Sequence, residues 1–189
     1  WQNDVVGFVL HSALLTPYWS WKFSHSKHHR YTNHIVKGET WTPSLIGEKV
    51  LLLSCIPLRL MMLPLGMPSY FMGQTQARTQ FDGTTPIDPK LGKSHLSSRS
   101  QTMPTDWRVD VSAGGVGALL LLLGLFAKKF GAAEVALWYF APYLVCNFYT
   151  VLYTWLHHTD ENVPHYGDET FTGLRGAMST IDRTYPWAI

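Results

Sequence analysis

The chain has 189 residues, enough for one domain with a substantial buried core. Only 15% of the residues are charged, below the roughly one quarter that is usual in soluble domains, and 14% are aromatic. A formal net charge of +2, with few basic residues near the histidines, gives no indication of a nucleic-acid partner.

The two cysteines, Cys55 and Cys146, both lie in apolar runs. We expect them to be small buried hydrophobic residues, not a disulfide pair or a metal knuckle. The sequence begins at Trp1 without a methionine and stops at Ile189 within a pattern, so we expect an internal fragment of a longer protein. For that reason the lack of a visible signal peptide carries no weight.

Residues 5–15 form a short apolar segment that contains His11. The segment is too short to cross a bilayer alone, although it can be the end of a spanning helix that begins upstream. No other histidine lies at helical spacing from His11, so we expect a packed, hydrogen-bonded side chain there and not a metal ligand.

The next segment carries the most informative pattern, because His25, His28 and His29 stand at i, i+3 and i+4. In a helix these three imidazoles project from one face. Thr16 and Pro17 predict the start of that helix, with a capping hydroxyl before a proline at the first helical position.

Three neutral imidazoles on one helical face suit zinc, copper, nickel or iron. One helix cannot close a metal site alone, so further ligands must come from elsewhere in the chain. The alternative is a surface helix that is merely rich in histidine. Lys27 and Arg30 are predicted to point away from the histidine face.

The connection at 33–44 is polar, and His34 falls nearly opposite His25 on a continued helix, which predicts that it is exposed to solvent. Charges and prolines interrupt the apolar segment 45–72, so we predict an interfacial or re-entrant segment, with a kinked span as the alternative. Residues 73–107 are predicted to form a long polar surface loop without chemistry, in which His95 is isolated.

Two later segments, 111–127 and 135–156, are nearly uncharged and long enough to cross a bilayer. Aromatic residues near the ends of the second one are typical of the membrane interface. The short link 128–134 favours a helical hairpin. We therefore predict an all-α integral membrane protein, with a transmembrane helical hairpin and cytosolic-side helices that carry the histidines; two buried helices of a soluble bundle are the weaker alternative.

A second histidine cluster follows the second span and consists of His157, His158 and, after a turn, His165. If the two clusters share one site, they lie on the same side of the membrane. Two crossings between them meet that condition and three do not, which favours a non-spanning 45–72. The two lysines of the hairpin link then lie on the far side, against the positive-inside tendency, but four basic residues near the first cluster outweigh them.

Imidazole clusters at a membrane edge indicate oxidative chemistry on a lipid, since breaking an unactivated C–H bond needs a redox metal that activates oxygen. Imidazole suits iron, while the scarcity of cysteine argues against iron–sulfur clusters and structural zinc. Apolar spanning helices can hold an acyl chain while the metal meets it near the interface.

Five stretches of the chain resemble the membrane-bound fatty acid desaturase family: GFVLHS at 7–12, PYWSWKFSHSKHH at 17–29, TWLHHTD at 154–160, PHY at 164–166 and GLRGAMSTIDR at 173–183. Within the family the chain is most similar to the eukaryotic delta-12 (oleate, omega-6) branch. The resemblance covers nearly the whole chain and is weakest at 73–107. It implies that residues 1–189 are part of a single desaturase domain.

The resemblance implies a di-iron centre built from three histidine boxes that face the cytosol. It makes His25, His28 and His29 iron ligands as the second box, with His158 as a further ligand; the first and third boxes are expected before Trp1 and beyond Ile189. Three weaker candidates are expected beside the ligands. His157 stands where many relatives have glutamine, His165 is also a possible ligand, and Asp160 is otherwise a solvated or ion-paired carboxylate.

By the same resemblance, the full protein is expected to lie in the endoplasmic reticulum membrane and to take electrons from cytochrome b5 and its NADH-dependent reductase. It would use O2 to introduce a cis double bond into a lipid acyl chain, converting oleate to linoleate. Two alternatives stay open. One is a sister oxidase on the same scaffold (an omega-3 desaturase, hydroxylase or acetylenase), and the other is a non-catalytic membrane metal-binding protein.

Overall fold

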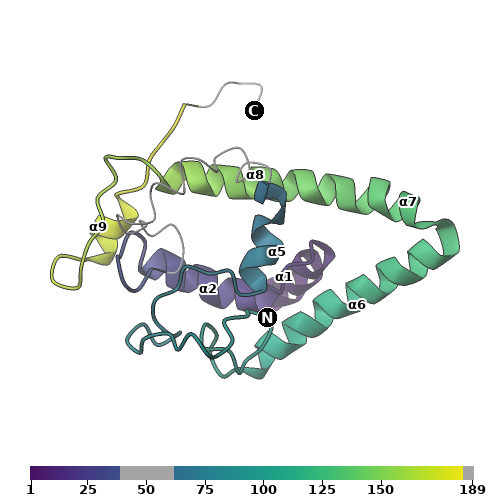
Figure 1. The fold of residues 1–189 in the computed structure, drawn as a ribbon, viewed down its shortest axis with the longest axis horizontal. Helices are drawn as coiled ribbons and strands as arrows, with labels where there is room; N and C mark the ends of the chain where they lie inside the picture. Colours follow the sequence, from purple (N-terminus) through teal and green to yellow (C-terminus); the bar gives the residue numbers. More distant parts are fainter. Residues whose placement is uncertain (39–61, 185–189) are drawn as a thin grey trace.

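The computed structural model describes residues 1–38 and 62–184, and these ranges are helical apart from loops and two isolated β-bridges (Figure 1). The prediction of an all-α chain is confirmed for this part. The elements are α1 (Gln2–Ala13), α2 (Tyr18–Arg30), the 3₁₀ turn η2 (Leu63–Leu65), α5 (Gly66–Phe71), α6 (Trp107–Phe130), α7 (Ala132–Val135), the π-helical turn η3 (Ala136–Phe140), α8 (Ala141–His158) and α9 (Gly173–Ala177).

Two helices in the described ranges are long and apolar enough to cross a membrane: Trp107–Phe130 and the continuous run Ala132–His158. The first has 24 residues, which corresponds to about 36 Å of helix, compared with about 30 Å for the hydrocarbon core of a bilayer. Figure 1 shows α6 and α8 as the two arms of a V that meet near α7. The predicted spans 111–127 and 135–156 lie inside these arms.

The link between the two arms is shorter than predicted. The sequence indicated a connection over 128–134, but α6 continues through both lysines to Phe130 and α7 begins at Ala132. Lysines in the last turn of a helix interact favourably with the helix dipole, which explains why α6 does not stop before them. The turn is made at Gly131, whose φ of 105° favours glycine.

Cys146 is exposed on α8, so the prediction that it is buried was wrong. The apolar run indicated burial because apolar side chains favour a core, but the described residues leave this side of α8 uncovered. Leu121 and Phe126 of α6 are likewise 65% and 58% exposed. Cys55 lies outside the described residues.

The histidine-bearing helix α2 forms as predicted, but its start is capped in another way. The Thr16 hydroxyl donates to the carbonyl of Leu14 instead of capping the helix, and Pro17 occupies the N-cap without a side-chain hydrogen bond. The backbone N–H of Trp19 donates to Ser112 Oγ of α6 over 2.8 Å. A side chain of α6 therefore satisfies one of the N–H groups that a helix start leaves without a partner.

Helix α1 packs beside α2 and α6. The ring of His11 lies 5.2 Å from that of Tyr18, and its Nδ1 lies 2.8 Å from the carbonyl oxygen of Gly7. The expectation of a packed, hydrogen-bonded histidine at this position is confirmed.

Gly115 provides the close contact between α6 and α1, and replacing it with alanine should separate the two helices. An added Cβ atom would lie 2.6 Å from Ser12 Oγ and 2.8 Å from Phe8 Cζ. We expect Gly115→Ala to lower the free energy of unfolding by about 1–3 kcal/mol, measured by denaturation in detergent. Gly114→Ala is the matched control, because no atom lies within 4 Å of its added Cβ. Equal stability of the two variants would contradict this packing.

The described part of the segment predicted as interfacial or re-entrant consists of η2 and α5, while 45–61 lies outside the described residues. Figure 1 shows α5 standing between α8 and α2. Its last residue, Phe71, meets Trp21 of α2 edge-on, with ring centroids 6.1 Å apart. The described residues 62–72 thus pack between α8 and the histidine-bearing helix α2.

The loop 73–106 lacks regular structure, as predicted, but it is not only a surface loop. Lys27 of α2 is buried and donates from Nζ to the carbonyl oxygen of Gln80 over 2.8 Å. His95 is fully buried, with its ring centroid 4.3 Å from that of Tyr70, so the prediction of an isolated surface histidine was wrong. The loop folds back on α5, where the N–H of His95 donates to the carbonyl of Phe71.

Candidate metal centre

The three histidines of α2 lie together, as the helical spacing predicted. The ring centroid of His25 is 4.5 Å from that of His29 and 5.9 Å from that of His28. The Nε2 atoms of His25 and His29 are 3.0 Å apart, within hydrogen-bond distance when one of them carries the proton. One turn earlier on the helix, Trp21 stacks on His25 at 4.5 Å and 19° and fixes the plane of its ring.

The second cluster reaches the first through the end of α8. His158 is the last residue of that helix, and its ring meets His28 edge-on at 4.9 Å. The two histidine patterns, 129 positions apart in the chain (158 minus 29), are therefore neighbours in space. This contact is the one that a shared site requires.

The segment after α8 is docked on the turn that follows α2, which we call the 31–38 turn. The N–H of Ile35 donates to Tyr166 O over 3.0 Å, and the N–H of Tyr166 donates to Asn33 O over 2.9 Å. Asn33 has a φ of 60°, a conformation that asparagine tolerates better than most residues. Its side-chain amide donates to the carbonyls of Gly176 and Ser179.

His34 lies inside this docked region, so the prediction that it is exposed to solvent was wrong. Only 1% of its surface is exposed. The helix ends at Arg30 and the chain turns, so the helical position relative to His25 no longer applies. Nδ1 of His34 accepts the N–H groups of Val36 and Lys37, and Nε2 lies 3.3 Å from Asp168 Oδ1.

Two imidazoles of α2, those of His25 and His28, are held in the neutral form that binds metals. Burial, followed by the charges of neighbouring imidazoles, lowers the pKa of His28 from its ordinary value of 6.5 to about 3. Burial also lowers the pKa of His25, and His29 adds to that effect. Both rings are therefore neutral at neutral pH, which is the protonation state that can bind a metal ion.

The fit of these residues to a metal ion is partial. Two nitrogen ligands of one ion, each bonded at about 2.1 Å, lie roughly 3 Å apart, and the His25–His29 pair has that separation of 3.0 Å. Among residues 1–38 and 62–184, however, no group of three or more His, Cys, Asp or Glu side chains has an arrangement that would hold a metal ion. The described residues supply paired imidazoles, and further ligands are needed, as the sequence indicated for a site on one helix.

The weaker candidates surround the end of α8. The carbonyl of His157 accepts the N–H of Ile181. His165 Nδ1 lies 3.2 Å from the carbonyl of Val163, and its buried Nε2 has no hydrogen-bond partner among the described residues. Asp160 accepts from Asn162 and, at 3.3 Å, from Arg183. These bonds, those from Asn162 first, lower the pKa of the Asp160 carboxyl.

Arg183 caps the end of α8. Its Nε donates to the carbonyl of Leu156 and its Nη2 to that of Thr159. These are carbonyls that the last turn of a helix leaves without intrahelical partners. Arg183 therefore holds the helix end that presents His158.

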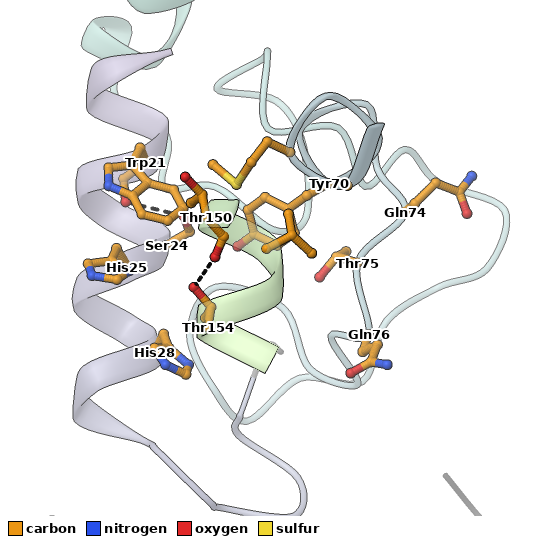
Figure 2. Close-up of a pocket in the computed structure, with 13 residues that line it drawn as sticks. Trp21, Ser24, His25, His28, Tyr70, Gln74, Thr75, Gln76, Thr150 and Thr154 are labelled. Carbon is orange, nitrogen blue, oxygen red and sulfur yellow. Dashed lines mark hydrogen bonds between the residues drawn. The ribbon is translucent and has the colours of Figure 1, made fainter. Parts of the chain in front are cut away.

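A pocket of about 300 Å³ adjoins the histidines. Figure 2 shows Trp21, His25 and His28 of α2 along one side of it and Tyr70 of α5 beside them. Its lining also includes three groups of residues: Gly66 and Met67 of α5, Thr150, Val151 and Thr154 of α8, and Ser24 with Gln74, Thr75 and Gln76. The surface of the pocket is mostly apolar. Because His25 and His28 are among its lining residues, a ligand inside it would lie directly against two candidate metal ligands.

Sequence reasoning did not find this pocket or the role of Lys27. The spacing of Lys27 correctly set it apart from the histidine face, but did not show that the loop covers it. One feature of the sequence does point to the pocket. Trp21 and His25 stand at i and i+4, which places an aromatic ring beside a candidate ligand.

The chain is similar to known proteins along nearly its whole length. The profile of the family described as "Fatty acid desaturase" matches residues 1–187. A Delta(12) fatty acid desaturase of Calendula officinalis is 35% identical over 97% of this chain, which covers 48% of that relative. The Delta(12)-fatty-acid desaturase of Arabidopsis thaliana is 33% identical over 98% of this chain and 48% of its own length.

An oleate hydroxylase of Claviceps purpurea is 34% identical over 96% of this chain and 43% of its own length. The chain thus spans about half the length of the curated relatives that it matches. No solved structure matches it. The match of a family profile to residues 1–187, together with the meeting of the two histidine clusters, shows that this chain belongs to the fatty acid desaturase family.

Proposed function

We propose that the full-length protein is an acyl-lipid desaturase that introduces a cis double bond, of the delta-12 type that converts oleate to linoleate. The observation that carries this proposal is the apolar pocket lined by His25 and His28, of which His28 also meets His158. The names of the relatives support the delta-12 assignment, since several of them are Delta(12) or omega-6 fatty acid desaturases.

In this proposal His25, His28, His29 and His158 contribute to holding two iron ions, together with histidines outside this chain. Bound iron would supply the activation of O2 needed to remove two hydrogens from neighbouring acyl carbons. The residues described here would bind and orient the acyl chain. Trp21 and Tyr70 offer apolar surface to the methylenes, and the pocket excludes bulk water from the carbons that lie beside His25 and His28.

The surroundings of the site follow from the same proposal. Residues 1–189 would form part of a single desaturase domain, with α6 and the α7–α8 run as a transmembrane hairpin and the histidines on the cytosolic side. Two relatives carry endoplasmic reticulum in their names, which supports that membrane as the location. Cytochrome b5 and its NADH-dependent reductase would supply the electrons.

A second candidate is a sister oxidase on the same scaffold. It is favoured by two relatives of equal similarity, the oleate hydroxylase of Claviceps purpurea and an acyl-lipid conjugase of Impatiens balsamina, each 34% identical. The names of these relatives describe a hydroxylase and a conjugase, and in this candidate function small differences in the pocket would decide which product forms. A non-catalytic metal-binding membrane protein is the third candidate.

Expression of the full-length protein in a yeast that makes oleate but no linoleate tests the proposal. We expect linoleate to accumulate, measured by gas chromatography with mass spectrometry. A hydroxylated or conjugated product in place of linoleate would support the sister oxidase. A purified protein that retains metal while the lipids of the host stay unchanged would contradict an acyl-modifying function.

A further inference from the structure

Helix α5 meets α8 at a contact that leaves no room for a methyl group. Gly66 is the first residue of α5, and an added Cβ atom there would lie 2.8 Å from Cγ2 and 3.2 Å from Cγ1 of Val151. Both residues line the pocket. The separation of α5 from α8 at this point therefore depends on the missing side chain of Gly66.

The glycine is not required by the backbone. Gly66 has a φ of −61° and a ψ of −47°, which are helical values that any residue adopts. Alanine would favour a helix by about 0.5–1 kcal/mol relative to glycine at such a position. Glycine at this position thus allows the close approach of α5 to α8, and is not needed for the backbone conformation.

Val151 cannot easily make room for a larger neighbour. A valine in a helix is held in one strongly preferred rotamer, so it does not simply rotate away. A methyl group at position 66 would take up space in the pocket wall and displace the Val151 side chain toward the pocket. Both effects narrow the pocket where α5 meets α8.

This width matters because of where the contact lies. The pocket of about 300 Å³ is at the small end of the range for ligand sites, so a few methyl groups occupy an appreciable part of it. His25 and His28 line the same pocket, as do Thr150 and Thr154 of α8 (Figure 2). A linear chain that enters this space presents to the histidines only those carbons that the width of the pocket allows.

We propose that the contact between Gly66 and Val151 is a specificity determinant, which sets the length and the carbon of the acyl chain that lies beside His25 and His28. This inference rests on the proposed function. It assigns a role in selectivity to two residues that hold no metal. It predicts that adding a methyl group on one side and removing two on the other have opposite effects.

The test uses the full-length protein in yeast with a mixture of acyl chains of different lengths. We expect Gly66→Ala to shift the products toward shorter chains or another carbon, and Val151→Ala to admit longer or bulkier ones. One methylene in an apolar pocket changes selectivity by about tenfold or more, which sets the expected size of each shift. The double variant Gly66→Ala with Val151→Ala should return toward the wild-type distribution.

Matched controls separate selectivity from general damage. Gly114→Ala adds a methyl group to a helix with no atom within 4 Å, and Val145→Ala shortens a valine of α8 that is 57% exposed. Both should keep the wild-type distribution. If Gly66→Ala loses all product, Val151→Ala and the double variant still decide the question.

Two negative outcomes are distinguishable. A wild-type protein that modifies acyl chains, with Gly66→Ala and Val151→Ala variants that retain its product distribution, would overturn this inference alone. A wild-type protein that yields no modified acyl chain would contradict the proposed function, and this inference would fail with it.

Discussion

Replacing His28 with alanine is expected to remove iron from the full-length protein. His28 occupies the centre of the cluster, with ring centroids 5.9 Å from His25, 5.6 Å from His29 and 4.9 Å from His158. Loss of a residue that merely supports a metal ligand costs about 10–100-fold in metal affinity, so loss of the ligand itself should cost more than about 100-fold. Iron content per purified chain, measured by mass spectrometry of the metal, gives the result without reference to activity.

Two variants serve as controls for this experiment. His11→Ala removes an imidazole that hydrogen-bonds within α1, and it should leave the iron content unchanged. His157→Gln keeps an amide in place of a ring that we expect beside the ligands, so it should retain iron. A His28→Ala protein that still holds two iron ions per chain would rule out His28 as a ligand.

The helices and the histidine face could be predicted because both depend on local periodicity. His25, His28 and His29 share a face wherever that stretch is helical, and the apolar runs of α6 and α8 are long enough to identify as potential spans without knowledge of their neighbours. Such features need no information about the rest of the fold.

The errors arose where tertiary contacts decide. His34 was predicted to be exposed by extending a helix that in fact ends at Arg30. His95 lies in a polar loop and is buried because that loop folds back on Tyr70 and Phe71. No periodic pattern in the sequence indicates such packing. Lys27 is buried by the same loop. The pocket combines residues of α2, α5, α8 and the loop, so no single stretch of sequence indicates it.

The contact between the two histidine clusters depends on residues that are not themselves candidate metal ligands. Arg183 fixes the last carbonyls of α8, and the 31–38 turn holds the following segment through Asn33, Ile35 and Tyr166. Hydrogen bonds of this kind contribute about 1 kcal/mol each, so several together can define the position of a helix end. We expect the geometry of the candidate metal centre to depend on this docking as well as on the imidazoles.

The substitution Gly176→Ala should disrupt the docking of the segment after α8 on the 31–38 turn, and with a larger effect than the other glycine-to-alanine substitutions above. Gly176 of α9 is buried, and an added Cβ atom would overlap the carbonyl oxygen of Thr32 and lie 2.9 Å from Phe171 Cε2. A backbone carbonyl cannot rotate away as a flexible side chain can, so the segment must separate from the 31–38 turn. We expect a loss of about 3 kcal/mol in the free energy of unfolding, measured by denaturation of the purified protein in detergent.

The same variant separates a structural role from a role in the metal centre. Because the docked segment, residues 164–179, lies a short way along the chain from His158 at the end of α8, iron affinity should also fall in Gly176→Ala. Competition with a chelator, at a temperature where the variant stays folded, measures it. Gly173→Ala is the matched control, since it lies in the same helix and no atom lies within 4 Å of its added Cβ. A folded Gly176→Ala protein with the iron affinity of Gly173→Ala would show that the docking of 164–179 does not position His158 against His28.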